Sequence, residues 1–184
     1  MTRRIHLHAG PRDHWIAGFA ALAIVIHILE AGVPTPIPGI KPGLANVITL
    51  VVLLRHDLLA AIWVQLLRVL VGSVLIGSFL TPTFLLSLSG ALCSLATLAL
   101  LIGWNRLLPP ARVGPIGLGV AAACAHMGGQ FFVAYTAFIP HPGLLTLLPV
   151  LLTAAMLFGA LTGWLAGALC LRLDNSPDAA APAR

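Results

Sequence analysis

The sequence predicts an all-α membrane protein, folded as a compact bundle of six transmembrane helices in which the second helix is short or broken. Two observations lead to this fold class. Of the 184 residues, 59% are hydrophobic and only 8% are charged, with a mean hydropathy of +1.03, whereas a soluble domain carries roughly a quarter charged residues. The apolar residues also gather into long runs that charged and turn-forming residues separate.

Each predicted helix corresponds to one apolar run. The first run begins at Trp15, a residue typical of the membrane interface. The second run is shorter than the roughly 20 residues that a spanning helix needs. The six predicted spans are residues 14–31, 43–54, 58–80, 83–103, 115–139 and 144–173. Residues 1–13 are predicted to be a cytoplasmic tail, and residues 174–184, rich in Asp, Pro and Ala, a disordered cytoplasmic tail.

The loop between the first two spans, residues 34–46, is the most unusual stretch of the chain. It holds prolines at positions 34, 36 and 38, which cannot continue a helix because each lacks an N–H and fixes its own φ. The loop carries one cation, Lys41, and polar residues flank it at Glu30 and Asn46. We therefore predict a rigid, polar junction between two membrane segments.

The basic residues predict the orientation of the chain. With six crossings, one side holds seven arginines and the other holds Lys41 alone. The arginines of the first side are Arg3, Arg4, Arg12, Arg55, Arg106, Arg112 and Arg172. The positive-inside rule then predicts a bacterial inner-membrane protein with both termini in the cytoplasm and the Lys41 loop outside. The net charge of +5 does not indicate nucleic-acid binding, because the basic residues are scattered.

Small residues mark the helix faces that can approach another helix closely. Gly159, Gly163 and Gly167 repeat every fourth residue on the sixth span, and Ala17 and Ala21 do so on the first. Such faces bring backbones together in lipid. Packing within the bundle and docking of a partner both remain open for them.

Several polar residues lie inside the predicted spans. Arg68 is about ten residues into the third span, or ~15 Å deep, where an arginine costs at least ~2.5–3.5 kcal/mol. The other polar positions fall in the outer half of the bundle, and the inner half offers no comparable set. They are His27, Glu30, Asn46, His126, Gln130 and Tyr135.

Three interpretations of this cluster compete. In the first, Arg68 pairs with Glu30 and the cluster is structural, since buried charges need partners. In the second, the residues line a ligand pocket open to the outside, with Arg68 and Lys41 as cationic contacts. The two interpretations can coexist, because Glu30 could hold Arg68 until an anionic ligand replaces it. The third, a proton relay through Glu30, His27, Arg68 and His126, would need ionisable groups through the whole membrane thickness. We favour the pocket, because intramembrane ionisable residues mark functional sites.

The ordered motifs of the chain resemble the Gx transporter family, also labelled heptaprenyl diphosphate synthase component I. The motifs are residues 38–46, 67–72, 78–90, 125–130 and 148–149, and the resemblance extends from about Ala23 to Gly167. The family pattern more often has asparagine at the position of Met127, and Pro42 also departs from it. The family is similar to the substrate-binding S components of energy-coupling-factor transporters. That similarity implies an outward-facing pocket, and a first helix whose alanines, here Ala17 and Ala21, contact a coupling subunit.

Known catalytic and metal motifs are missing from the sequence. Prenyl chain elongation needs clustered aspartates for magnesium, but Asp13, Asp57, Asp174 and Asp178 are separate and outside the spans. No phosphate-binding G-x-x-x-x-G-K-[ST] loop is found. The three cysteines are far apart and have no C-x-x-C spacing, which argues against a disulfide or metal site. We therefore expect neither an enzyme nor a cofactor.

Two functions follow as expectations. The first is an S-component-like transport protein that captures a small, anionic ligand from outside, such as a vitamin-like compound or an isoprenoid or quinone precursor. Its partners would be the lipid bilayer, the ligand and a transmembrane coupling subunit with ATPases. The alternative is a non-catalytic membrane component of polyprenyl diphosphate or quinone biosynthesis, which would bind a soluble prenyl synthase. Nucleic acid is not an expected partner.

Overall fold

The computed structural model describes residues 10–32 and 43–175, and within these ranges all regular structure is helical. Five helices are long and apolar enough to cross a membrane, which makes the chain a multi-pass membrane protein. The elements are α1 (Pro11–Gly32), α2 (Ala45–Arg55), α3 (Leu58–Ile76), α4 (Pro82–Leu107), η1 (Pro109–Ala111), α5 (Pro115–Val133), the π-helical η2 (Ala134–Phe138), α6 (Pro142–Leu145) and α7 (Leu148–Asp174). The predicted all-α bundle with a short second helix is confirmed.

Several helix ends differ from the predicted spans for local reasons. Helix α3 stops at Ile76 and not at residue 80, because Gly77 takes the left-handed conformation (φ 75°) that closes a helix. Helix α4 continues to Leu107, where the following proline pair ends it. The predicted sixth span is divided into α6 and α7, each with a proline in its first turn. The predicted tail boundaries at residues 13 and 174 fall inside α1 and α7, and the rest of both tails lies outside the described residues.

Helix α2 is the centre of the bundle. Eight of its eleven residues are buried, and it contacts α1, α3, α5 and α7. Because α2 is apolar on every side, it is stable only when neighbours surround it. The residues Val47, Leu50 and Val52 belong to the main hydrophobic core. The short second span is therefore an internal helix that the longer helices enclose.

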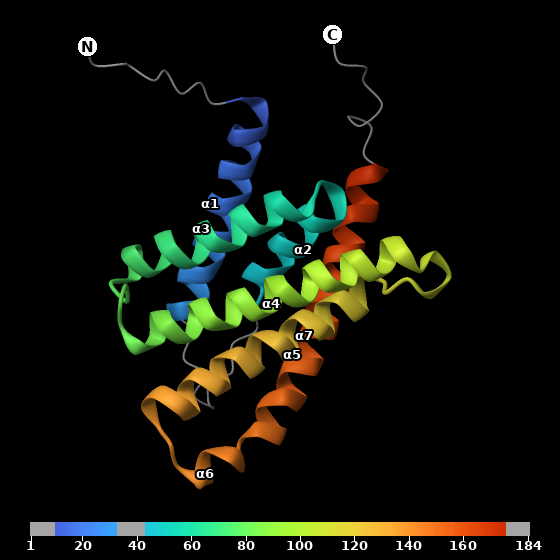
Figure 1. The fold of residues 1–184 in the computed structure, drawn as a ribbon. Coiled ribbons are helices and arrows are strands. Elements are labelled where there is room, and N and C mark those ends of the chain that lie inside the picture. The colour runs from blue at the N-terminus through green and yellow to red at the C-terminus, as the bar shows by residue number, and fades with distance from the viewer. Residues whose placement is uncertain (1–9, 33–42, 176–184) are drawn as a thin grey trace, which may run out of the picture.

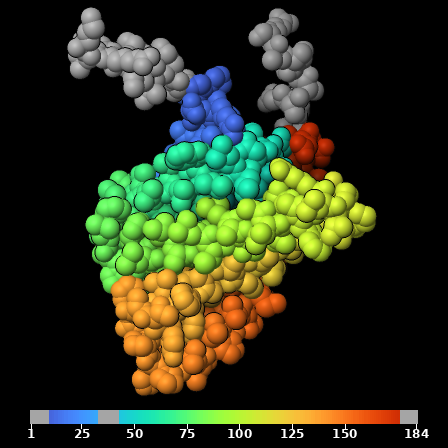
Figure 2. Space-filling model, in the orientation of Figure 1, coloured from blue at the N-terminus to red at the C-terminus, as the bar shows by residue number. Residues whose placement is uncertain are grey.

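The long helices around α2 contact one another in sequence. Contacts connect α1 to α3, α3 to α4, α4 to α5 and α5 to α7. In Figure 1, α3, α4 and α5 cross the view side by side, while α1 and α7 run steeply behind them. The space-filling view in Figure 2 shows α3, α4 and α5 forming most of the face toward the reader. The beginning of α1 and the end of α7 lie at the same end of the molecule (Figure 1).

The glycine face of α7 packs against α5. A Cβ on Gly163 would collide with the backbone oxygen of Pro115, and one on Gly159 would lie 2.8 Å from the Cβ of Ala123. Gly167 is less crowded, since its Cβ would stand 3.4 Å from the Cβ of Pro115. Close backbone approach of this kind is how helices associate in lipid. Within this chain, α5 occupies the face that Gly159 and Gly163 provide.

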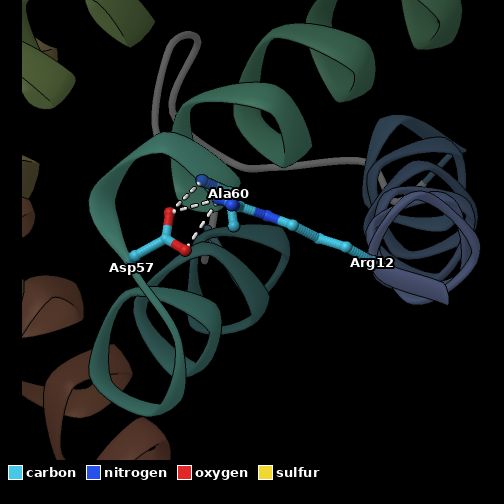
Figure 3. Close-up of polar contacts among 3 residues, drawn as sticks. All are labelled: Arg12, Asp57 and Ala60. Atoms are coloured by element: carbon cyan, nitrogen blue, oxygen red, sulfur yellow. Dashed lines mark hydrogen bonds and ion pairs between the residues drawn. The ribbon is translucent and has the colours of Figure 1, made fainter. Parts of the chain in front are cut away.

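Ion pairs join the helix ends at the end of the molecule where α1 begins and α7 finishes, which we call the basic end. Arg12 of α1 donates to both carboxylate oxygens of Asp57, at 3.0 and 2.8 Å. Figure 3 shows that Asp57 also accepts from the N–H of Ala60 (2.8 Å), and so caps α3. Arg55 of α2 pairs with Asp174 of α7 at 2.7 Å. Two of the exposed arginines at this end, Arg12 and Arg55, therefore have ion-pair partners.

Candidate functional site: a charged cavity between the helices

A cavity of about 410 Å³ lies between the helices, in the half of the molecule away from the basic end. Its walls include the last turn of α1 and the first turns of α2, α4 and α7, together with α3 and α5. A volume of this size falls in the range of small-molecule sites, about 300–1,000 Å³. Six of the polar residues singled out from the sequence line it, namely His27, Glu30, Asn46, Arg68, His126 and Gln130.

Arg68 is the deepest charge in this cavity. It occupies the eleventh position of α3, and only 5% of its surface is exposed. Its side chain makes no hydrogen bond or ion pair with any described residue, and its Nε is buried without a partner. A buried charge left without a partner costs about 3–5 kcal/mol relative to the paired state. The guanidinium is therefore held in an energetically unfavourable position beside an open space.

Glu30 is close to Arg68 but bonds elsewhere. It is close enough for an electrostatic interaction with Arg68, yet no nitrogen–oxygen distance between them falls within 4.0 Å. Its carboxylate accepts from the N–H of Leu44 at 2.6 Å and, more weakly, from that of Ala45 at 3.5 Å. These are N–H groups that a helix start leaves without intrahelical partners. The direct Arg68–Glu30 pair expected in the structural interpretation is therefore wrong, because the carboxylate caps α2.

Glycines make room for the other polar side chains of the cavity. A Cβ on Gly90 of α4 would lie 2.8 Å from atoms of both His126 and Gln130. A Cβ on Gly72 of α3 would stand 3.1 Å from the ring of His27. The Nδ1 atom of His126 is buried without a hydrogen-bond partner. The α3 and α4 backbones thus allow three hydrogen-bonding side chains to reach the space beside Arg68.

Much of the cavity wall is apolar. The larger apolar side chains come from α4, α5, α6 and α7 and include Leu86, Phe131, Leu144, Leu151 and Phe158. Small residues of α7, such as Ala154 and Ala155, complete it. The cavity lining therefore combines charged and hydrogen-bonding groups with apolar side chains.

Other predicted residues lie elsewhere. Tyr135 belongs to the π-helical turn and is not part of the cavity wall; its ring stacks on Phe131 with centroids 6.5 Å apart. Lys41 lies outside the described residues, so its role stays a prediction. Ala17 and Ala21 are exposed on α1. They are thus accessible in the single chain, which leaves the expected partner contact untested.

A second, smaller group of polar residues was not predicted from the sequence. A cavity of about 20 Å³ shares the walls Asn46, Ala123 and Thr162 with the larger one. Within it, the Thr49 hydroxyl donates to Gln65 Oε1 at 2.7 Å, and Gln65 is only 1% exposed. This space can hold about one water molecule. The expectation that the inner half has no comparable polar set is therefore wrong, because Gln65 lies one turn below Arg68 on the same face of α3.

The comparison with family models decides where the chain belongs. The model described as heptaprenyl diphosphate synthase component I matches residues 19–169. The chain belongs to this family. The match runs from α1 to α7 and so includes every residue of the charged cavity that the structure describes. No curated protein and no solved structure matches the chain.

The family description names a component of a synthase, so we asked which chemistry this member's cavity could perform. Among residues 10–32 and 43–175, no group of three or more His, Cys, Asp or Glu side chains could hold a metal ion. The cavity of this synthase-component family member offers instead a cation, two imidazoles, two amides and an apolar wall. Those groups are suited to binding and orienting a small molecule.

Proposed function

We propose that this member of the heptaprenyl diphosphate synthase component I family is a membrane-embedded binding protein for a small anionic molecule with an apolar body. The observation that carries the proposal is Arg68, which is buried and has no ion-pair partner among the described residues, at the wall of a cavity of about 410 Å³. An anion that reaches the guanidinium gains a charge-assisted contact and relieves the cost of the unpaired charge. The free-energy cost of the unpaired charge in the ligand-free protein thus contributes to the affinity for an anion.

We further propose that the ligand enters from outside the cell. Gly43 and Leu144 line the cavity and belong to the end opposite to the basic end. Arg12, Arg55 and Arg172 lie at the basic end, which the positive-inside rule assigns to the cytoplasm. Capture from outside, followed by delivery through a coupling subunit with ATPases, would make the protein a transport component. The exposed alanines of α1 are available for such a subunit.

Native mass spectrometry of the full chain, purified in mild detergent, tests the proposal. The wild type should carry a small anion, detectable after release in negative-ion mode. Arg68→Gln should lose it, while Arg12→Gln, which removes an exposed and paired cation, should keep it. The same adduct on Arg68→Gln as on the wild type would contradict binding at Arg68.

The family description favours a second candidate, a non-catalytic membrane component that binds a soluble prenyl synthase. The docking surface would then be the basic end, where Arg106 and Arg112 are exposed. Charge reversal of both residues to glutamate should weaken co-purification with a synthase subunit and leave an anion bound at Arg68 unaffected. Loss of synthase binding in Arg68→Gln, with no effect of the double reversal, would contradict this candidate.

A further inference from the structure

We infer that the ligand's head group carries a single negative charge, as a carboxylate does, and is not a diphosphate. This inference rests on the proposed function and narrows it to a ligand class. Its basis is the charge balance of the cavity. Of the described residues that line the cavity, Arg68 and Glu30 carry the two formal charges, and only one of these charges lacks a partner.

The charge of Glu30 is already compensated. Its carboxylate accepts from the N–H groups of Leu44 and Ala45 at the start of α2. A helix N-terminus acts as about half a positive charge, and the two N–H groups solvate the carboxylate as water would. Glu30 lies at the wall of the site, with 8% of its surface exposed.

The charge of Arg68 is compensated only in part, because Glu30 interacts with it without approaching within 4.0 Å, and this difference sets the valence of the ligand. One negative charge on the ligand neutralises the guanidinium and leaves the site balanced. A diphosphate carries at least two negative charges, so it would leave an excess anion buried near the Glu30 carboxylate. Like charges repel strongly where the dielectric constant is low, and like-charge juxtaposition disfavours the wrong ligand.

The hydrogen-bonding groups also match a flat, two-oxygen head group. The guanidinium presents parallel N–H donors that fit both oxygens of a carboxylate. His126 and Gln130 lie side by side against Gly90 and can complete the contacts to one oxygen. The buried Nδ1 of His126 has no hydrogen-bond partner within the part of the chain that the structure describes. The apolar body would then lie along Phe131, Leu151 and Phe158.

Matched probes test the inference by thermal unfolding of the full chain in detergent. We would compare geranic acid with geranyl diphosphate and 4-methylpentanoate with isopentenyl diphosphate, because the members of each pair have similar apolar bodies. Geraniol serves as the uncharged control. We expect at least one carboxylate to bind the wild type about tenfold more tightly than its diphosphate, and this stabilisation to vanish in Arg68→Gln.

A second variant tests the reason for the preference. Glu30→Gln keeps an oxygen for the Leu44 N–H and removes the negative charge, so its preference for the carboxylate should fall by about tenfold. Tighter binding of a diphosphate than of its carboxylate by the wild type would overturn the inference. If Arg68→Gln abolished that diphosphate binding, the proposed anion capture would still stand. If no probe stabilised the wild type more than geraniol, the inference would be overturned. An unknown anion lost in Arg68→Gln would then still support the proposed function.

Discussion

The paired arginines at the basic end and the arginine in the cavity have opposite environments. At the basic end, Arg12 and Arg55 are solvent-accessible and pair with Asp57 and Asp174. In the cavity, Arg68 is 5% exposed and has no ion-pair partner among the described residues. Exposed pairs are typically worth about 0–1 kcal/mol, whereas a buried, unpaired charge is costly. Arg12 and Arg55 are thus paired where pairing contributes least, whereas Arg68 has no such pair among the described residues.

This contrast separates charges that serve the architecture from a charge that serves binding. The pairs at the basic end connect the ends of α1 and α2 to those of α3 and α7, and they need no further partner. Arg68 contributes nothing comparable to the fold, because its nearby acid, Glu30, is committed to α2. A buried charge that costs stability and has no ion-pair partner among the described residues is the kind of group that an anionic ligand can pair with. The following variants test that distinction, from the largest expected effect to the smallest.

Replacing Arg68 should have opposite effects on binding and stability. Arg68→Met should weaken binding of the co-purifying anion by at least about 30-fold, since losing one partner of a buried charged contact costs about 2–5 kcal/mol. The ligand-free variant should nevertheless be more stable, by up to about 3 kcal/mol, because the intramembrane charge is removed. Thermal unfolding with and without ligand measures both effects. A less stable ligand-free variant would indicate a structural role for Arg68.

Gly90→Ala should disturb the cavity without removing any charge. The new Cβ would lie 2.8 Å from atoms of His126 and Gln130, so both side chains must move away from α4. We expect affinity to fall by about tenfold, which corresponds to roughly 1.4 kcal/mol. Gly103→Ala on the same helix is the matched control, because its Cβ would meet nothing within 4 Å. Equal affinities of the two variants would argue against a role for His126 and Gln130.

These residues also illustrate what the sequence could and could not predict. Hydropathy and charge placed the helices and brought Arg68, His126 and Gln130 to the same depth, because an ionisable or amide group in a long apolar run is conspicuous. The partner of Glu30 could not be predicted in this way, since its bonds to Leu44 and Ala45 depend on how the chain returns to start α2. Such contacts depend on how the helices pack in three dimensions, which the hydropathy pattern of the sequence does not specify.

Two further misses have similar causes. Tyr135 shares the outer part of its helix with Gln130, but the π-helical turn begins at Ala134 and changes the direction of the side chains that follow. Gln65 was overlooked because an uncharged residue in an apolar run carries a weaker signal than a charged one. Its i, i+3 spacing to Arg68 was the signal available. The 20 Å³ cavity itself depends on how α2, α3, α4, α5 and α7 meet.

Gln65 provides a test of uncharged polar burial in the same bundle. Gln65→Leu should destabilise the protein by about 1–3 kcal/mol, because the Thr49 hydroxyl loses its acceptor. Adding Thr49→Val should recover much of that loss, since replacing both partners by apolar groups can be nearly neutral. Thermal unfolding of the two single variants and the double variant completes the cycle. Additive losses would show that the two side chains do not act as a pair.

The smallest effect is expected at the basic end. Arg12→Ala should change the free energy of unfolding by at most about 1 kcal/mol, because both charges of the pair are exposed, and added salt should reduce even that change. Asp57→Ala should cost more, about 0.5–2 kcal/mol, and part of that loss should persist in high salt, because Asp57 also caps α3 through the Ala60 N–H. Unfolding in low and high salt separates the two contributions. If Arg12→Ala destabilised the protein as much as Asp57→Ala at both salt concentrations, the Arg12–Asp57 pair would be needed to hold α1 against α3. The pair would then be structurally important, and the contrast with Arg68 would not be one between a weak exposed pair and a costly buried charge.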